Sequence, residues 1–141
     1  MSDRRVVITG IGIVSPLAFG REATWERLIE GKSGAGRIDT FDPEDMPCKI
    51  AFQVPWKTGR GGGEGDPHAF DPEAFVSSKE MRRIDEFILY AIAAADEAVE
   101  DSGWRPEDEE GQERTGVLIG SGIGGLESIY QTAITLHENG P

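Results

Sequence analysis

Two apolar runs in the chain each lead into a glycine-containing turn and then into a helical pattern. The first spans residues 4–14, RRVVITGIGIV, and the second spans residues 116–125, GVLIGSGIGG. Short apolar runs of this kind are typical of strands that are covered on both faces. Glycines in the turn let the backbone lie close to a ligand or to another segment. The sequence therefore predicts two strand–turn–helix units, with helices near residues 22–30 and 126–138.

The strongest helical pattern runs from Lys79 to about Asp101. Its apolar positions recur at three- and four-residue steps, at Met81, Ile84, Ile88, Ala91, Ile92, Ala95, Ala98 and Val99. Such spacing builds one apolar stripe along a helix. Ser77 and Glu80 have the spacing of a capping box, and Gly103 is placed to end the helix. We expect one continuous helix of about 23 residues, roughly 35 Å long.

Between these elements the chain has one short candidate strand and one glycine-rich loop. Residues 49–54 alternate weakly and predict a third strand. Residues 58–72, TGRGGGEGDPHAFDP, are rich in Gly and Pro, so we expect a mobile, inserted surface loop that buries little. Helical and strand patterns together predict an α/β protein, and 141 residues suit one domain.

Composition narrows the classes of function. The formal net charge of −12 argues against nucleic acid as a partner, because binding phosphates requires a basic surface. No apolar run is long enough to span a bilayer, and no signal segment precedes the first strand, so we expect a cytoplasmic protein without a membrane partner. The single cysteine, Cys48, allows no internal disulfide and fits a reducing compartment.

The first glycine turn partly matches a dinucleotide-binding fingerprint. Gly10, Gly12 and Ser15 stand at its small positions, but Pro16 intervenes where a phosphate-binding helix should begin. No clear second strand ends in an acidic residue about 20 positions further on, where a ribose would be bound. Neither glycine run contains a GK[ST] sequence, which excludes a P-loop. A nucleotide site is therefore the weaker interpretation of these glycines.

Few side chains have the surroundings of a catalytic group. Cys48 lies in irregular sequence with no helix start after it and no histidine near it, which favours a small packing or surface thiol over a nucleophile. His68 and His137 lack metal-ligand spacing with Cys48 or with each other. We expect two exposed histidines and no metal site.

One group of basic residues has both a structural and a functional interpretation. Lys79, Arg82 and Arg83 lie at i, i+3 and i+4, so they share one face of the predicted helix. That face is either solvated surface, with Arg82 paired to Asp85 or Glu86, or a docking patch for an acidic partner.

Ile123 is the one bulky apolar residue inside the second glycine turn. Such a residue commonly plugs the core of a domain. The alternative is that it lines or gates an apolar cavity, because its glycine neighbours leave the turn free to move.

Four segments, in order, resemble the N-terminal part of bacterial β-ketoacyl-acyl carrier protein synthases, and most of all the type II elongating enzyme of fatty acid synthesis. They are RRVVITGIGIVSP from Arg4, Trp25 ahead of LIEGKSG, KEMRRIDEFILYAIAAADEAVEDSG from Lys79, and GVLIGSGIGGL from Gly116. Four segments in the right order are more specific than any one glycine motif. The loop at residues 58–72 departs from the family, because it is longer than the usual connection.

The resemblance implies a thiolase-like αβαβα layered fold of two duplicated halves, with residues 1–141 forming part of the first half. The family's nucleophilic cysteine and two histidines come after the position of Pro141, so we expect no catalytic residue in this chain, and Cys48 is not their counterpart. The complete enzyme would condense malonyl-carrier with an acyl-cysteine, without a metal or redox cofactor.

The resemblance also implies roles for residues that are present. Lys79, Arg82 and Arg83 match the basic patch that binds the acidic acyl carrier protein. Ile123 matches the apolar residue at the mouth of the acyl pocket, where its rotamer gates chain entry. The family further implies a homodimer. Two alternatives stay open: the non-catalytic chain-length partner of a polyketide synthase, and a stand-alone module that binds acyl carrier protein.

Overall fold

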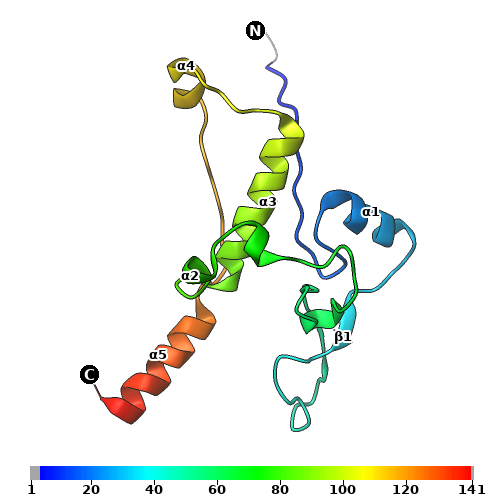
Figure 1. The fold of residues 1–141 in the computed structure, drawn as a ribbon, viewed down its shortest axis with the longest axis vertical. Coiled ribbons are helices and arrows are strands. Elements are labelled where there is room, and N and C mark those ends of the chain that lie inside the picture. Colours follow the sequence, from blue (N-terminus) through cyan, green and yellow to red (C-terminus); the bar gives the residue numbers. More distant parts are fainter. Residues whose placement is uncertain (1–3, 141) are drawn as a thin grey trace.

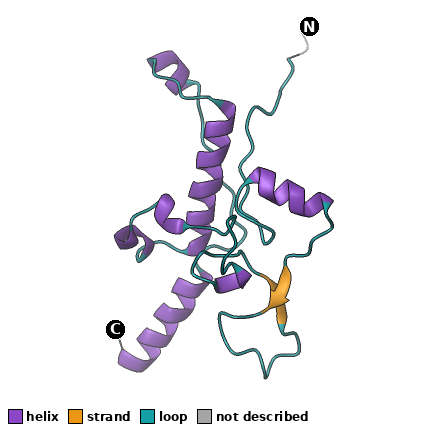
Figure 2. Ribbon diagram, turned by 45° about the vertical axis from the view of Figure 1, so that its right-hand side comes forward, coloured by secondary structure: helices purple, strands orange, loops and turns teal. Residues whose placement is uncertain are grey.

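The computed structural model describes residues 4–140. The elements follow in the order α1 (Arg21–Ile29), β1 (Ala35–Arg37), β2 (Ile50–Phe52), η1 (Arg60–Gly62), η2 (Pro72–Ala74), α2 (Ser78–Met81), α3 (Glu86–Ser102), α4 (Glu109–Glu113) and α5 (Leu126–Asn139). Helices and loops make up most of the chain, and the short strands lie away from α3 (Figure 2). No helix in residues 4–140 is both long and apolar enough to span a membrane.

Helix α3 is the element around which the other segments are arranged (Figure 1). Residues 4–14 run beside it in an extended conformation, and the connection from α4 to α5 returns along it toward its first turn (Figure 1). Both extended segments therefore run opposite to α3. This is the arrangement of two parallel strands joined by a crossover helix.

The two strands predicted in these extended segments do not form among the described residues, and this prediction is wrong for the chain as it stands. Neither segment belongs to a ladder; Val14 makes only an isolated bridge with Phe19. The side chains of Val6 and Leu118 are 95% and 100% exposed. A strand requires a neighbour that exchanges backbone hydrogen bonds with it, and none lies beside these segments within residues 4–140.

The strand predicted over residues 49–54 is confirmed in a shorter form as β2. It pairs antiparallel with β1, with Ala35 opposite Phe52 and Arg37 opposite Ile50. Strand β1 was not predicted, because its AGR sequence continues a glycine-rich loop.

The helices predicted near residues 22–30 and 126–138 are confirmed as α1 and α5. The continuous helix predicted from Lys79 is wrong, because α2 ends at Met81 and α3 begins only at Glu86. Asp85, between them, has an extended backbone with φ −76° and ψ 158°. Its carboxylate accepts a hydrogen bond from the Ser128 hydroxyl of α5 at 2.5 Å, which connects this break to α5.

Both predicted signals at the ends of this helical region are confirmed. The Ser77 side chain accepts from the Glu80 backbone N–H, while the Glu80 carboxylate accepts from the backbone N–H of Ser77, as in a capping box. Gly103 ends α3 in the left-handed conformation, with φ 63°. Local sequence therefore determines where the region starts and stops, but not that it is interrupted.

An aromatic cluster forms the core against α3. Phe70 is fully buried beside Leu89 and Ala93 of α3. The rings of four other residues surround Phe70 with centroid separations of 5.2, 5.3, 5.8 and 6.0 Å: Trp56, Tyr90, Phe19 and Phe75. The expectation that residues 58–72 bury little is therefore wrong, since this segment contributes the central ring of the core.

Candidate functional site at the start of helix α3

The predicted basic patch lies just before α3. Lys79 belongs to α2, whereas Arg82 and Arg83 lie in the turn between α2 and α3. All three side chains are exposed. The break in the helix means that they do not share one helical face, so that part of the prediction is corrected. They remain within one short segment, and we call these three residues the basic patch.

Among the described residues the structure shows no ion pair between Arg82 and Asp85 or Glu86, the pairing expected if the basic residues were only solvated surface. Glu86 instead forms an ion pair with Arg60 of η1, and Asp85 accepts a hydrogen bond from Ser128. In the part of the chain that the structure describes, no carboxylate forms an ion pair with any residue of the basic patch. The patch therefore presents uncompensated positive charge in a chain of net charge −12.

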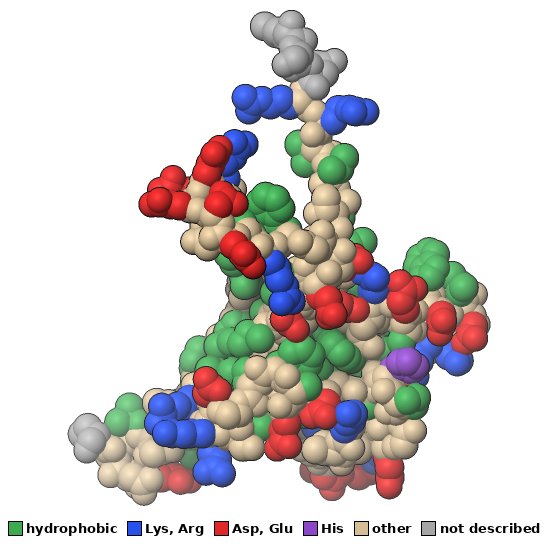
Figure 3. Space-filling model, turned by 45° about the horizontal axis from the view of Figure 1, so that its top comes forward, with side chains coloured by type: hydrophobic (Ala, Val, Ile, Leu, Met, Phe, Trp, Pro, Cys, Tyr) green, Lys and Arg blue, Asp and Glu red, His purple; other side chains and the backbone are tan. Residues whose placement is uncertain are grey.

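The basic patch borders helix α5. A cavity of about 400 Å³ is lined by Arg82 and Arg83 on one side and by Glu127, Ser128 and Gln131 of α5 on the other. Figure 3 shows basic side chains gathered at this side of the molecule, while acidic side chains gather over the distant α4. Elsewhere the two charge types are mixed in ion pairs such as Arg27–Asp66 and Arg114–Glu110, so the basic patch differs in having no such pair within residues 4–140.

Ile123 lies on the turn that leads into α5, next to the same end of α3. Its side chain is 74% exposed, so it plugs no core within the described residues. Together with Phe87 and Leu126 it lines a cavity of about 190 Å³. Gly125, at the N-terminus of α5, has φ 70°, a left-handed conformation that favours glycine. The structure therefore brings the turn and the basic patch to one end of α3, although they are some 40 residues apart in sequence.

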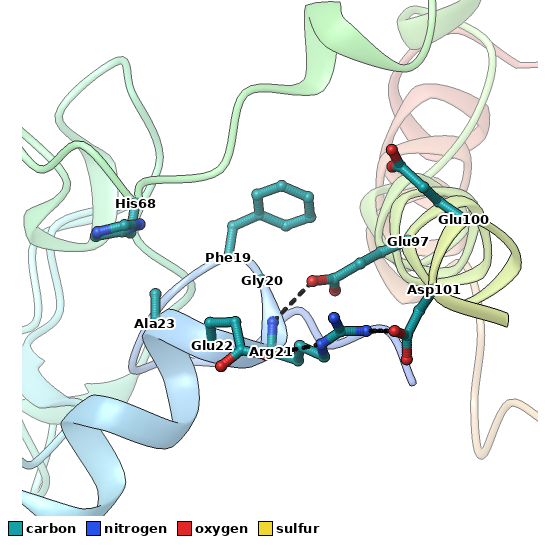
Figure 4. Close-up of a pocket in the computed structure, with 9 residues that line it drawn as sticks. All are labelled: Phe19, Gly20, Arg21, Glu22, Ala23, His68, Glu97, Glu100 and Asp101. Carbon is teal, nitrogen blue, oxygen red and sulfur yellow. Dashed lines mark hydrogen bonds and ion pairs between the residues drawn. The ribbon is translucent and has the colours of Figure 1, made fainter. Parts of the chain in front are cut away.

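A third cavity, of about 510 Å³, lies at the start of α1 toward the other end of α3 (Figure 4). One carboxylate oxygen of Glu97 accepts from the backbone N–H of Ile13 and the other from that of Arg21, each at 2.8 Å. Asp101, one turn later, accepts from the N–H of Ile11 at 3.0 Å and pairs with the Arg21 guanidinium. These contacts, the Ile11 N–H foremost, hold the pKa of Asp101 below its usual value.

The first glycine turn is in direct contact with α3. A Cβ added to Gly12 would lie 1.9 Å from the carbonyl oxygen of Ala94, and one added to Gly10 would lie 2.1 Å from that of Ala98. The glycines thus serve close packing of backbone on helix. Glu97 and Asp101 beside them would also repel a phosphate, which weighs further against a dinucleotide.

Sequence reasoning missed Glu97 and Asp101. Their signal was two carboxylates at i and i+4 beside the apolar stripe of a helix, a position where a charge needs a partner. Nothing in the sequence indicated that backbone N–H groups, more than 70 residues earlier, would be those partners.

A further polar cluster joins the glycine-rich segment to α3. The Arg60 guanidinium pairs with Glu86 and lies 4.0 Å from the centroid of the Trp56 ring. The Trp56 indole N–H donates to the Tyr90 hydroxyl at 3.0 Å, and that hydroxyl donates to Glu86 at 3.1 Å. Burial raises the pKa of Tyr90 to about 12, so the phenol stays protonated and able to donate.

The remaining candidate groups show no catalytic arrangement. Cys48 is exposed, and its thiol donates to the Ile50 carbonyl at 3.4 Å. His68 and His137 are also exposed, as expected. Within residues 4–140 no group of three or more His, Cys, Asp or Glu side chains is placed to hold a metal ion.

Comparison with known proteins identifies the family. Residues 3–140 match the family described as "Beta-ketoacyl synthase, N-terminal domain". The chain belongs to this family.

Several relatives of this β-ketoacyl synthase chain are 3-oxoacyl-[acyl-carrier-protein] synthases. It is 49% identical over 98% of its length to synthase 2 of Rhizobium meliloti. It is 42% identical over its whole length to synthase 2 of Vibrio cholerae, and 40% identical over 94% of its length to the mitochondrial synthase of Arabidopsis thaliana. The chain spans only 30–31% of the length of these relatives.

A solved structure, "The ishigamide ketosynthase/chain length factor", is similar to the β-ketoacyl synthase chain in three dimensions. The TM-score is 0.56 at 33% identity, and the match covers 71% of this chain and 22% of the other. This likeness supports the predicted thiolase-like fold, of which the described residues form a part.

Proposed function

We propose that this protein is a 3-oxoacyl-[acyl carrier protein] synthase of fatty acid elongation, and that residues 1–141 form part of the first half of its αβαβα layered fold. The observation that carries this proposal is the 49% identity to the Rhizobium meliloti synthase over 98% of the chain. The remainder of the polypeptide would supply the nucleophilic cysteine and the two histidines. We further propose that the enzyme is a cytoplasmic homodimer.

The proposed reaction is a decarboxylative Claisen condensation. The cysteine thiolate takes the acyl group from a carrier thioester and releases the carrier thiol. Malonyl-carrier then loses carbon dioxide, and the electrons of the broken C–C bond form an enolate whose oxygen the histidines stabilise. The enolate carbon attacks the acyl-cysteine carbonyl and releases the cysteine thiolate. The product is a 3-oxoacyl-carrier two carbons longer than the starting acyl group.

The described residues would contribute carrier docking. Lys79, Arg82 and Arg83 are exposed, carry no ion pair within residues 4–140 and stand out in a strongly acidic chain. Exposed charges of this kind add modest affinity and steer an oppositely charged partner toward its binding site. We therefore assign the basic patch to binding of the acidic acyl carrier protein.

Ile123 would contribute control over the acyl chain. It is an exposed apolar side chain in a turn with glycines on both sides, so its rotamer and its backbone can both change. In the complete protein we place it at the mouth of the acyl pocket. Ile123→Phe should lower kcat/KM for long acyl-carriers about five- to a hundredfold relative to short ones, because overpacking costs roughly 1–3 kcal/mol where a wall cannot yield.

The decisive experiment is a condensation assay on the full-length protein with acyl- and malonyl-carrier. We expect a 3-oxoacyl-carrier product and release of carbon dioxide. The 141-residue chain, assayed beside it, should form no product above a boiled control, because none of its residues has the environment of a nucleophilic thiolate. A full-length protein that binds acyl-carrier but forms no product would refute the proposal.

The second candidate is the non-catalytic chain-length partner of a polyketide synthase. It is favoured by the similarity to the ishigamide ketosynthase/chain length factor. The residue at the nucleophile position of the full-length protein separates the two candidates, since the chain-length partner lacks the cysteine. A stand-alone carrier-binding module is less favoured, because Val6 and Leu118 leave extended apolar segments uncovered.

A further inference from the structure

The turn that carries Ile123 is attached to α3 at a few identifiable atoms. Gly124 lies against the ring of Phe87, in the first turn of α3: a Cβ added to Gly124 would lie 2.6 Å from Cζ and 3.0 Å from both Cε atoms. The next residue, Gly125, lies against Asp85, whose Oδ2 would be 2.9 Å from an added Cβ. Two consecutive residues of the turn, Gly124 and Gly125, thus lie against the side chains of Phe87 and Asp85 at the start of α3.

Asp85 makes a second connection to the same segment. Its Oδ1 accepts a hydrogen bond from the Ser128 hydroxyl, in the first turn of α5, at 2.5 Å. A short hydrogen bond to a carboxylate is stronger than a neutral one. Ile123 is therefore followed within a few residues by a ring contact, a close backbone approach and a charged hydrogen bond, and all three lead to residues 85–87.

Phe87 is also close enough to affect the gate residue through the space they share. Phe87 and Ile123 both line the cavity of about 190 Å³, together with Leu126. Phe87 is 40% exposed and Ile123 is 74% exposed, so neither is locked in a packed core within residues 4–140. The orientation of the ring consequently sets how far the turn, and with it Ile123, can approach α3.

We infer that Phe87 and Asp85 are positioning residues that set the place of Ile123, and through it the acyl-chain selectivity of the condensation. This inference rests on the proposed function. Asp85 directly follows the Arg82–Ile84 turn, so the same short connection also carries two residues of the basic patch. The basic patch and Ile123 are thus both connected to the short segment at the start of α3.

The first test measures selectivity in the full-length protein. Phe87→Ala frees the turn, and the ratio of kcat/KM for tetradecanoyl- over hexanoyl-carrier should rise about fivefold, a change in differential activation free energy of roughly 1 kcal/mol. Phe52→Ala is the matched control, because Phe52 lies on β2, is 68% exposed and is far from the turn in sequence and contacts. The control should leave the ratio unchanged.

Exchanging bulk between positions 87 and 124 tests whether the two residues act together or whether each substitution simply destabilises the protein. Gly124→Ala alone should rotate the Phe87 ring and shift the turn, because its methyl group would overlap that ring. The double variant Phe87→Ala/Gly124→Ala removes the overlap and partly refills the space, so its selectivity ratio should return toward that of the parent. Additive effects of the two changes would show that ring and turn do not act together.

A readout that needs no catalysis is the Ile123 methyl resonance in protein labelled at isoleucine methyl groups. Phe87→Ala and Asp85→Asn should each shift or broaden it, while Phe52→Ala should not. If Phe87→Ala does not fold, Phe87→Leu replaces it, since it keeps apolar bulk but lacks the ring.

The outcomes distinguish this inference from the proposed function. A parent that forms no 3-oxoacyl product refutes the proposed function, and the methyl resonance still decides whether Phe87 and Asp85 position Ile123. A parent that condenses, with selectivity that responds to Ile123→Phe but not to Phe87→Ala, overturns the inference alone. An unmoved Ile123 methyl in both variants overturns it as well.

Discussion

The two ends of helix α3 each hold a glycine turn, but they hold it by different means. Toward the C-terminal end, Gly10 and Gly12 press on carbonyl oxygens of the helix backbone, and Glu97 and Asp101 bind the neighbouring N–H groups. At the N-terminal end, the second turn meets only side chains. A helix backbone cannot move aside without breaking hydrogen bonds, whereas a ring or carboxylate can change its rotamer.

Helix α3 therefore holds the first turn rigidly and leaves the second turn able to move. The first turn lies directly against the backbone of α3, so a side chain at Gly10 or Gly12 would overlap the helix. The second turn can shift together with the side chains that hold it, which suits a segment that carries a gate. Matched substitutions at the two ends of α3 can therefore test whether the two turns differ in this way.

The largest effect should come from adding a methyl group at the first turn. Gly12→Ala places a Cβ 1.9 Å from the Ala94 carbonyl oxygen, and should lower the free energy of unfolding of the full-length protein by about 3 kcal/mol, measured by urea denaturation. Gly124→Ala should cost only about 1 kcal/mol, since the Phe87 ring can rotate. Gly120→Ala, which meets nothing within 4 Å, is the control. Equal losses at positions 12 and 124 would contradict the comparison.

Removing the carboxylate that binds the first turn should have the next largest effect. Glu97→Ala leaves the backbone N–H groups of Ile13 and Arg21 without their acceptors, and should lower the free energy of unfolding by about 2 kcal/mol. Glu100→Ala, three residues later on the same helix, removes an exposed carboxylate and should cost less than about 0.5 kcal/mol. A similar loss from both substitutions would mean that Glu97 acts only through overall charge.

At the other end of α3, charge reversal should change binding without changing stability. Lys79→Glu, Arg82→Glu and Arg83→Glu together should weaken acyl-carrier binding about tenfold at low salt, since exposed pairs contribute roughly 0.2–1 kcal/mol each. The difference from the parent should shrink as salt is added, because charges are screened beyond about 10 Å at 0.1 M. Isothermal titration with unfolding curves measures both properties.

The matched control reverses exposed arginines at the opposite end of the molecule, Arg4, Arg5 and Arg105. It applies the same change of net charge and should leave carrier affinity close to that of the parent. If both triple variants weaken binding equally, the effect belongs to net charge and the basic patch has no special part in docking.

The smallest effect should appear in the pH dependence of stability. The pKa of Asp101 is held below its ordinary value of 3.8, mainly by the Ile11 N–H. Its contribution is therefore complete above about pH 4 and is lost as the pH falls through the lowered, folded-state pKa. Asp101→Asn should make the fall in stability below pH 4 shallower, as followed by thermal unfolding at several pH values. An Asp96→Asn control should keep the slope of the parent.

Features fixed by neighbouring residues were predictable from sequence. The capping box at Ser77 and the glycine stop at Gly103 depend on contacts within a few positions, and both formed as expected. Helices α1 and α5 likewise follow from local periodicity. The basic patch and Ile123 were found as candidates in the same way, but their proximity was not, because it depends on how α5 meets α3.

Features that depend on distant partners were not predictable. The apolar spacing continues through Ile84 and predicts no break there, whereas Asp85 is extended and its carboxylate accepts from Ser128, 43 residues away. Phe70 sits in a segment whose composition indicates exposure, and its burial depends on rings from other parts of the chain. The two extended apolar segments were wrongly predicted as strands, because a strand forms only where a second strand meets it, and no partner lies beside them within residues 4–140.

The aromatic cluster also provides a fluorescence signal for the docking of the glycine-rich segment on α3. Of its three tryptophans, Trp25 and Trp104 are 60% and 55% exposed. Trp56 instead packs against Phe70 and donates its indole N–H to Tyr90. Indole emission moves to shorter wavelength in apolar surroundings, so with Trp25 and Trp104 replaced by Phe, the remaining fluorescence reports when the glycine-rich segment docks on α3.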